Sequence, residues 1–110
     1  MIHQVGVVHR DIKPSNIIMG NPDIPDDKNR IYIIDFGLST KYHKKNNKED
    51  HITFTRFDCR VGTLTFMSVN SHRFHSQSRR DDLLSLAYVL GYLGKGKLPW
   101  SNLMRNGKSR

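Results

Sequence analysis

The sequence predicts an α+β fold in which short β-strands surround a polar loop, and a long irregular segment then leads to a buried α-helix. Three observations support this prediction. Short runs of β-branched residues flank a charged, proline-containing loop near the N-terminus. No hydrophobic period is sustained between residues 38 and 78, and leucines then recur at helical spacing from residue 81 to 93. At 110 residues the chain can hold one small domain at most.

The predicted strands are short and rich in β-branched side chains. GVVH (6–9) and NIIM (16–19) flank the loop RDIKPS, in which Pro14 excludes a helix through the middle because it lacks an N–H and blocks the preceding turn. The segment GNPDIPDDKN (20–29) is dense in turn-forming residues and leads into a third predicted strand, IYII (31–34).

The helix is predicted from Asp81 to Leu93. Ser78 and Asp81 have the spacing of a capping box, and Gly94, Gly96 and Pro99 are expected to end the helix. Because apolar residues occur on several faces, we expect protein to enclose the helix on most sides; these residues are Leu83, Leu84, Leu86, Ala87, Tyr88, Val89, Leu90 and Leu93.

Charge suggests an anionic partner only weakly. Eighteen Lys and Arg residues against ten Asp and Glu give a net charge of +8. The densest basic cluster, Lys41 to Lys48, lacks regularly interleaved aromatic residues, which favours a solvated loop over a nucleic-acid surface. A basic nucleic-acid binder is therefore an interpretation that only the net charge supports.

Cysteine content and hydropathy indicate the compartment. The single Cys59 excludes an internal disulfide and a multi-cysteine zinc site, which is typical of a reducing environment. His72 and His75 have a spacing that suits a metal on a helix, but no third ligand is evident, so we expect no zinc there. We find neither a membrane-span pattern nor a signal peptide, and therefore expect an intracellular protein, cytoplasmic, nuclear or both.

The residues with the clearest chemistry lie in and after the loop. Asp11, Asn16 and Asp35 offer hard oxygen ligands suited to Mg²⁺, and Lys13 offers a point charge for phosphate. Any one of the aspartates alone is typical of a turn or a helix cap. Together they predict a site for Mg²⁺ and a phosphate ester.

These residues also carry a resemblance to a family. HRDIKPSN (9–16) resembles the catalytic loop of eukaryotic protein kinases, and Asp35-Phe36-Gly37 resembles their magnesium-binding motif. SVNSH (68–72) looks like the Ser-Ile-Asn form typical of casein kinase 1, at the place where most kinases have Ala-Pro-Glu, and residues 77–100 are also similar to that family. The resemblance extends from about Ile2 to Trp100.

The resemblance implies an ATP- and Mg²⁺-dependent serine/threonine kinase with a protein substrate. It implies that Asp11 accepts or orients the proton of the substrate hydroxyl, and that Lys13 stabilises charge on the transferred group. Asn16 and Asp35 would hold the magnesium ions with the nucleotide. Thr63 would tie the activation segment to the catalytic aspartate.

Supporting roles follow from the same resemblance. His9 and Arg10 would be structural supports, and Phe36 would pack beneath the site. Gly37 would give the backbone freedom at the turn. Asp82, in the predicted helix, would accept hydrogen bonds from the backbone of the catalytic loop.

Other parts of a kinase are not recognisable in this sequence, which contains no Gly-rich loop, no paired strand lysine and no adenine pocket. We therefore expect residues 1–110 to be a partial kinase domain, from the catalytic loop to the central helix of the C-terminal lobe. Lost positioning can be worth about 7–11 kcal/mol of barrier, so we expect this chain alone to be inactive. An exposed hydrophobic patch and self-association are also expected, and a non-catalytic binding module is the alternative function.

The sequence departs from casein kinase 1 in two places. Family members prefer acidic or phosphorylated substrates, recognised partly through basic activation-segment residues, and the aligned positions here read Thr55 and Asp58. This departure leaves the acidic preference open. Ser15 replaces the usual aspartate before Asn16, a change we expect to leave the metal ligand intact.

Overall fold

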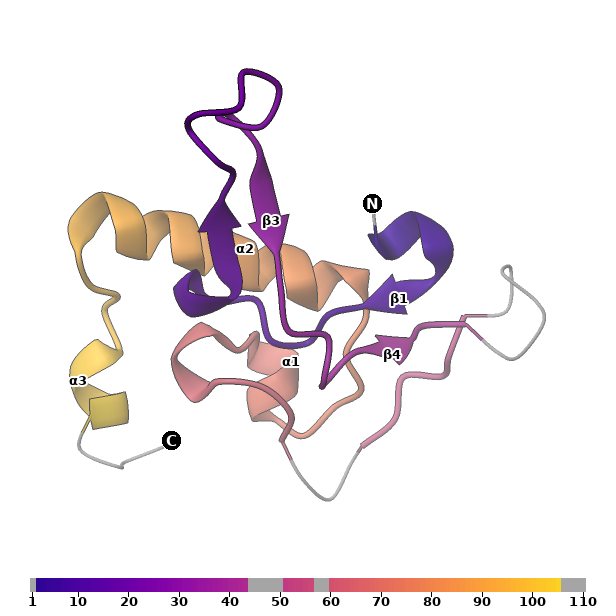
Figure 1. The fold of residues 1–110 in the computed structure, drawn as a ribbon. Helices are drawn as coiled ribbons and strands as arrows, with labels where there is room; N and C mark the ends of the chain where they lie inside the picture. The colour runs from indigo at the N-terminus through magenta and orange to yellow at the C-terminus, as the bar shows by residue number, and fades with distance from the viewer. Residues whose placement is uncertain (1, 44–50, 57–59, 106–110) are drawn as a thin grey trace.

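Two small antiparallel sheets and one long helix organise the chain (Figure 1). The computed structural model describes residues 2–43, 51–56 and 60–105. Strand β1 (Val7–Val8) pairs with β4 (Thr40–Lys41), and β2 (Ile17–Met19) pairs with β3 (Ile31–Ile33). The prediction of short strands mixed with few helices is confirmed.

The β2–β3 hairpin projects from the rest of the molecule (Figure 1). Its register pairs Ile17 with Ile33 and Met19 with Ile31. The Gly20 N–H donates to the Arg30 carbonyl over 2.9 Å and closes the connection. Residues 20–29 thus form the turn that their Gly, Pro, Asn and Asp content predicts.

The segment expected to be irregular contains several short elements. Strand β4 returns beside β1 with Val8 opposite Thr40. The 3₁₀ turn η3 (Leu64–Phe66) and helix α1 (Val69–His72) follow, and two further 3₁₀ turns, η1 (Ile2–Val5) and η2 (Pro14–Asn16), lie earlier in the chain. The absence of sequence periodicity there reflects elements too short to show a period.

Helix α2 spans Arg79–Lys95, and α3 spans Ser101–Arg105. The capping prediction is confirmed, since the Asp81 carboxylate accepts the Ser78 N–H over 2.8 Å. The helix runs through Gly94 to Lys95, and its C-cap residue Gly96 has a φ of 76°, which suits a residue without a side chain.

The interior of the described region is small and largely polar. Ten polar or charged residues are buried against six apolar ones. All ten buried polar residues lie in the polar loop (residues 9–16), in residues 68–78 or in the first turns of α2. The apolar core consists of Val8, Ile12, Tyr42, Met67, Val89 and Leu98. Hydrogen bonding therefore has a large part in joining distant segments.

The expectation of a buried helix is wrong for most of the apolar side chains of α2. Its buried residues are Asp81, Asp82, Ser85 and Val89, whereas Leu90 and Leu93 are 64% and 66% exposed. The physical reason is that its polar side chains face the described elements, where Asp81 and Asp82 accept hydrogen bonds and Ser85 donates one to the Phe66 carbonyl. The leucines point to sides that no described element covers, as the expected exposed hydrophobic patch requires.

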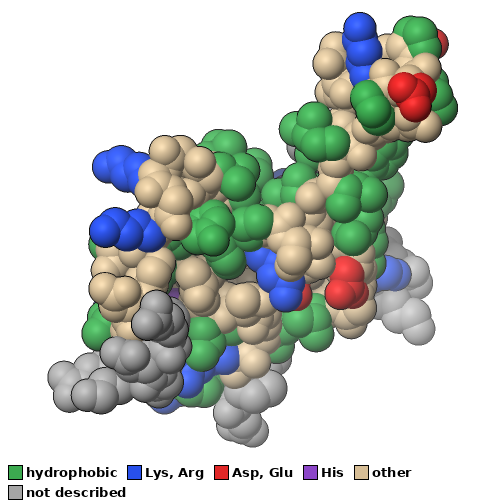
Figure 2. Space-filling view, turned by 60° about the vertical axis from the view of Figure 1, so that its left-hand side comes forward, with side chains coloured by type: hydrophobic (Ala, Val, Ile, Leu, Met, Phe, Trp, Pro, Cys, Tyr) green, Lys and Arg blue, Asp and Glu red, His purple; other side chains and the backbone are tan. Residues whose placement is uncertain are grey.

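The molecule is also thin. Its extents are 45 × 41 × 19 Å, and its radius of gyration of 15.5 Å exceeds the roughly 13 Å typical of a compact domain of this length. Figure 2 shows hydrophobic side chains on the surface of the projecting hairpin.

No helix in the described ranges has both the length and the apolar character needed to cross a membrane.

Candidate active site

The start of the polar loop (residues 9–16) is fastened to α2 by one carboxylate. Asp82 Oδ2 accepts the His9 N–H over 2.8 Å, and Asp82 Oδ1 accepts the Arg10 N–H over 2.9 Å. Asp82 is only 5% exposed, so its charge depends on these donors for stabilisation. The helix thereby holds a backbone segment more than 70 positions earlier in the sequence.

His9 and Arg10 connect this loop to the segment around Asp35. The fully buried His9 ring accepts the Asp11 N–H at Nδ1, so its proton lies on Nε2, which donates to the Ile34 carbonyl over 2.9 Å. Arg10 Nε donates to the Leu38 carbonyl over 2.6 Å. Both side chains therefore link the polar loop to the backbone on either side of Asp35.

Arg10 also has an unusual backbone conformation. Its φ is 69°, a region that costs a residue with a side chain of the order of 1 kcal/mol or more. The hydrogen bond from its N–H to Asp82 offsets part of that cost. The turn of the loop that orients Asp11 thus depends on the carboxylate below it.

Asp11 is surrounded by groups of the predicted site. Its Oδ1 accepts the Thr63 hydroxyl over 2.7 Å, and Lys13 Nζ lies 3.6 Å from its Oδ2. Asn16 Nδ2 donates to the Asp11 carbonyl over 2.9 Å and lies 3.4 Å from Oδ2. The carboxylate is therefore oriented from both of its oxygens.

Gly62 permits the approach of Thr63. Its φ is +112°, and a Cβ built on it would lie 2.5 Å from the Arg10 carbonyl oxygen. Only a residue without a side chain fits between the two segments. The sequence shows the Gly62–Thr63 pair, but it does not show which distant carbonyl makes the glycine necessary.

The hairpin brings the residue before Asp35 into contact with Asn16. The Ile34 N–H donates to the Asn16 carbonyl over 2.9 Å, and Asp35 follows directly. Asp35 Oδ1 accepts the Gly37 N–H over 3.2 Å. The sheet register thus brings the two predicted metal ligands to the same end of the hairpin.

The turn after Asp35 differs from expectation at Gly37. We expected Gly37 to provide backbone freedom, but the residue in the left-handed region is Asp35, with φ 60°. A short polar side chain tolerates that region, and here its carboxylate caps the turn by accepting the Gly37 N–H. Phe36 packs edge-on against the His9 ring at 5.1 Å between centroids, yet is 47% exposed.

The donor set fits Mg²⁺ bound together with phosphate oxygens. Asn16 uses its amide nitrogen toward Asp11, which leaves its amide oxygen as the potential ligand, and Asp35 adds a carboxylate. Mg²⁺ is held in proteins by one or two such oxygens plus substrate phosphates. Among the residues that the structure describes, no cluster of three or more His, Cys, Asp or Glu side chains could hold a metal by itself.

A buried polar network anchors the segment that carries Thr63. Ser68 Oγ donates to Asp81 Oδ1 over 2.5 Å, and Gln77 Nε2 donates to the Val61 carbonyl over 2.8 Å. Ser71 Oγ donates to the same carbonyl over 3.3 Å. Both ends of the 61–68 stretch are therefore tied to the region where α2 begins.

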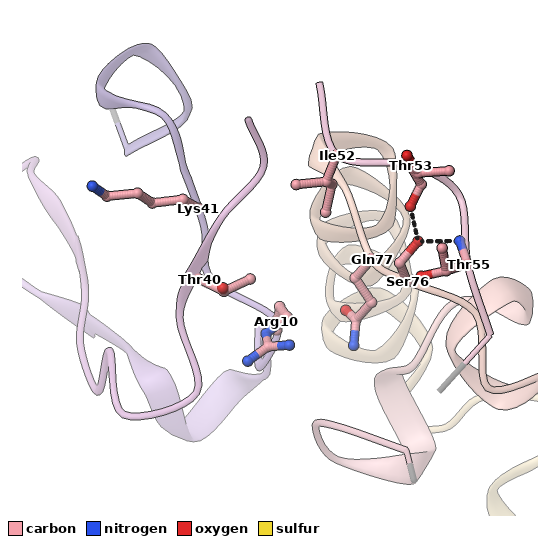
Figure 3. A pocket seen from close by; sticks show the side chains of 8 residues that line it. All are labelled: Arg10, Thr40, Lys41, Ile52, Thr53, Thr55, Ser76 and Gln77. Carbon is pink, nitrogen blue, oxygen red and sulfur yellow. Dashed lines mark hydrogen bonds between the residues drawn. The ribbon is translucent and has the colours of Figure 1, made fainter. Parts of the chain in front are cut away.

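A hollow of about 380 Å³ lies beside the polar loop (Figure 3). The Arg10 and Gln77 side chains end near its centre, whereas Lys41 extends away from it. Ser76 Oγ closes one wall by accepting the Thr55 N–H and donating to the Thr53 carbonyl. Thr55 therefore lies in this wall. It is the neutral residue that aligns with a basic activation-segment position of casein kinase 1.

Several residues named in the sequence analysis are not part of the candidate site. Lys44 to Lys48 of the basic cluster, Asp58 and Cys59 lie outside the described residues.

His72 is partly buried, and this burial lowers the pKa of its imidazole below 6.5. A hydrogen bond with the Leu64 backbone raises the pKa, and the positive charge of Arg60 lowers it.

Sequence reasoning also missed His3. Its Nε2 lies 2.8 Å from Asp82 Oδ2, the oxygen that also accepts the His9 N–H. No motif spacing links residues 79 positions apart, so the sequence offered no signal for this contact.

Comparison with known proteins points to the same family as the motifs around Asp11 and Asp35. A family model described as protein kinase domain matches residues 1–110. Casein kinase I homolog 2 of Schizosaccharomyces pombe is 41% identical over 102 residues, which make up 93% of this chain and 23% of that protein. Casein kinase I homolog 2 of Saccharomyces cerevisiae is 38% identical over 102 residues, with coverage of 93% and 18%. The chain spans less than a quarter of the length of these curated relatives.

Proposed function

Because the chain belongs to the protein kinase family, as a casein kinase I-like member, we propose that it carries the catalytic loop of a kinase that transfers phosphate from ATP to protein serine or threonine. The observation that carries this proposal is the orientation of Asp11 by the Thr63 hydroxyl at 2.7 Å. This hydrogen bond holds Asp11 Oδ1, and Asp11 Oδ2 faces Lys13 and Asn16.

In this mechanism Asp11 receives or orients the proton of the attacking hydroxyl. Lys13 Nζ, 3.6 Å from Asp11 Oδ2, stabilises negative charge that develops on the transferred group. Asn16 and Asp35 would hold Mg²⁺, which supplies neutralisation of the phosphate oxygens when bound. Catalysis of this kind depends mainly on positioning, which is what the hydrogen bonds around Asp11 provide.

A chimera tests the chemistry directly. Residues 2–100 replace the aligned segment of an active casein kinase I enzyme, and phosphorylation of a protein substrate is measured. We expect activity, and we expect Asp11→Asn to lower kcat by about 10²–10⁴-fold because the proton acceptor is lost. Ser15→Ala, at an exposed loop position, serves as the control. A chimera that folds and binds nucleotide but transfers no phosphate would contradict the proposal.

The 110-residue chain itself is expected to be inactive. The nucleotide-binding residues that we assign number only three, namely Lys13, Asn16 and Asp35. Titration of the purified chain with ATP and Mg²⁺ should therefore show no tight site. Micromolar affinity would overturn this expectation, since it would require a nucleotide clamp within these residues.

A non-catalytic binding module is the second candidate. The observation that favours it is the exposed leucine face of α2, which includes Leu83 at 59% and Leu90 at 64% exposure. An apolar helix face of this kind can pair with another helix. Retention of Asp11, Lys13, Asn16 and Asp35 favours the kinase proposal over this one, because a pure binding module has no need of them.

A further inference from the structure

We infer that Phe74 is a positioning residue, whose ring receives the Arg60 guanidinium and so fixes the start of the stretch that brings Thr63 to Asp11. The consequence for phosphoryl transfer rests on the proposed function of Asp11. The contact itself is independent of that function, because both partners belong to this chain. Phe74 lies in the turn between α1 and α2, and none of the motifs of the candidate site includes it.

The first argument is the backbone conformation of Phe74. Its φ is 64°, in the left-handed region, where a bulky side chain is an outlier because its Cβ crowds the backbone. Such a conformation persists only where the surrounding structure imposes it. Phe74 follows Arg73, the C-cap of α1, and glycine is the usual residue in a left-handed conformation directly after a helix. The interactions of the ring therefore have to offset a backbone cost that glycine would not incur.

The second argument is the contact that the ring makes. The guanidinium carbon of Arg60 lies 4.9 Å from the centroid of the Phe74 ring, within the distance at which a cation is attracted to an aromatic face. Both residues are partly buried, so water screens this attraction less than it would on an open surface. The Phe74 N–H donates to the Ser71 carbonyl over 3.0 Å, which fixes the turn that carries the ring. The contact therefore joins the α1–α2 connection to Arg60.

The turn at Phe74 also brings two donors to the residue that follows Arg60. Gln77 Nε2 donates to the Val61 carbonyl over 2.8 Å, and Ser71 Oγ donates to the same carbonyl over 3.3 Å. Ser71 precedes the left-handed residue and Gln77 follows it, so the direction of the chain at this turn decides whether both reach one carbonyl. The turn thus holds two consecutive residues, one through the ring and one through hydrogen bonds.

These two residues lead directly to the group that orients the proposed catalytic carboxylate. Only Val61 and Gly62 separate Arg60 from Thr63, whose hydroxyl donates to Asp11 Oδ1 over 2.7 Å. Gly62 itself packs closely against the backbone of the polar loop. Without the ring contact, the start of this short stretch would move more freely, and the Thr63 hydroxyl would be aligned on the carboxylate for a smaller share of the time.

The test uses three substitutions of Phe74 in the complete ¹⁵N-labelled chain. Phe74→Tyr keeps the ring, whereas Phe74→Ala and Phe74→Gly both remove it. Glycine, unlike alanine, relieves the left-handed backbone, so we expect the Gly variant to unfold at a higher urea concentration than the Ala variant. The side-chain amide of Gln77 reports on the contact with Val61. We expect its ¹⁵N–¹H signals to move toward those of an exposed glutamine in the Ala and Gly variants, and to stay in place in the Tyr variant.

Activity of the chimera gives a readout that a purely structural role would not move in the same way. A cation–π contact is worth enough to change an equilibrium by roughly 2- to 30-fold. We therefore expect kcat to fall by a factor in that range, equally in the Ala and Gly variants, with KM for ATP unchanged and with the Tyr variant fully active. If Phe74 acted only through stability, the Gly variant would keep more activity than the Ala variant, and that result would overturn the inference.

Arg60→Met tests the other partner and decides the matter if the Phe74 variants fail to fold. Methionine keeps an extended side chain without the charge, so we expect the same fall in kcat and the same movement of the Gln77 signals. Arg73→Met, at an exposed arginine beside Phe74, is the matched control and should change neither. Unchanged Gln77 signals in Arg60→Met would refute the contact.

The Gln77 signals need no nucleotide and no phosphoryl transfer. A chimera without any activity would therefore count against the proposed function, whereas the contact between Arg60 and Phe74 would still be decided by the spectra of the 110-residue chain.

Discussion

The Thr63 hydroxyl donates to Asp11 Oδ1 over 2.7 Å, although the two residues are 52 positions apart. This bond joins the segment before η3 to the polar loop. Gly62 makes it sterically possible, since the Arg10 carbonyl occupies the space that any Cβ would need. The orientation of the proposed catalytic carboxylate is thus decided by contacts between segments.

Removal of the Thr63 hydroxyl should lower activity. In the chimera we expect Thr63→Val to reduce kcat/KM by about 10- to 100-fold, because a hydrogen bond to a charged group is worth about 1.5–3 kcal/mol. Thr63→Ser keeps the hydroxyl and should retain most of the activity. Steady-state phosphorylation kinetics of both variants provide the measurement, and equal rates for Val and Thr would show that the bond does not orient Asp11.

Ser68 should contribute to stability through Asp81. Its hydroxyl donates to Asp81 Oδ1, and both residues are almost fully buried. Ser68→Ala leaves that carboxylate oxygen without this donor, so we expect a loss of about 1–3 kcal/mol in the free energy of unfolding. Urea unfolding monitored by circular dichroism measures it. The exposed Ser15→Ala is the matched control and should change stability by less than about 0.5 kcal/mol.

The exposed leucines of α2 should drive association. Leu90 and Leu93 are more than 60% exposed, and contacts between copies would remove them from water. Leu90→Lys combined with Leu93→Lys should lower the average mass seen by sedimentation at high concentration and leave the circular dichroism spectrum unchanged. Val89→Lys, at a residue only 1% exposed, should instead unfold the chain. An unchanged mass in the double variant would argue against this surface.

His72 should make stability depend on pH. Burial lowers its pKa in the folded chain below the ordinary value of 6.5, so between these two values only the unfolded chain binds the proton. Its contribution to stability is therefore complete above pH 6.5 and is lost as the pH falls through the folded pKa. His72→Gln should flatten the unfolding free energy between about pH 7 and 5. The exposed His51→Gln should keep the slope, and an identical slope in the His72 variant would contradict the assignment.

Local chemistry made several elements predictable. The turn of residues 20–29 and the start of α2 depend on Gly, Pro, Asn and Asp or on a capping pair a few positions apart, and both form as expected. The resemblance to kinases also indicated Asp82 as a partner of the polar loop, where the structure places it. The left-handed conformation at Asp35 rather than Gly37 was not predictable, because residue type alone does not choose between adjacent positions.

The sequence by itself determined the order of the motifs, the strands β1, β2 and β3, the turn between β2 and β3, and the chemical type of each candidate ligand, because these depend on neighbouring residues. Only the tertiary structure decided that His3 meets Asp82, that Gly62 meets Arg10, and that the leucines of α2 remain exposed. Contacts across 50 to 80 positions depend on how segments close in space. Burial likewise depends on what covers a surface, and the periodicity of a helix carries no information about its neighbours.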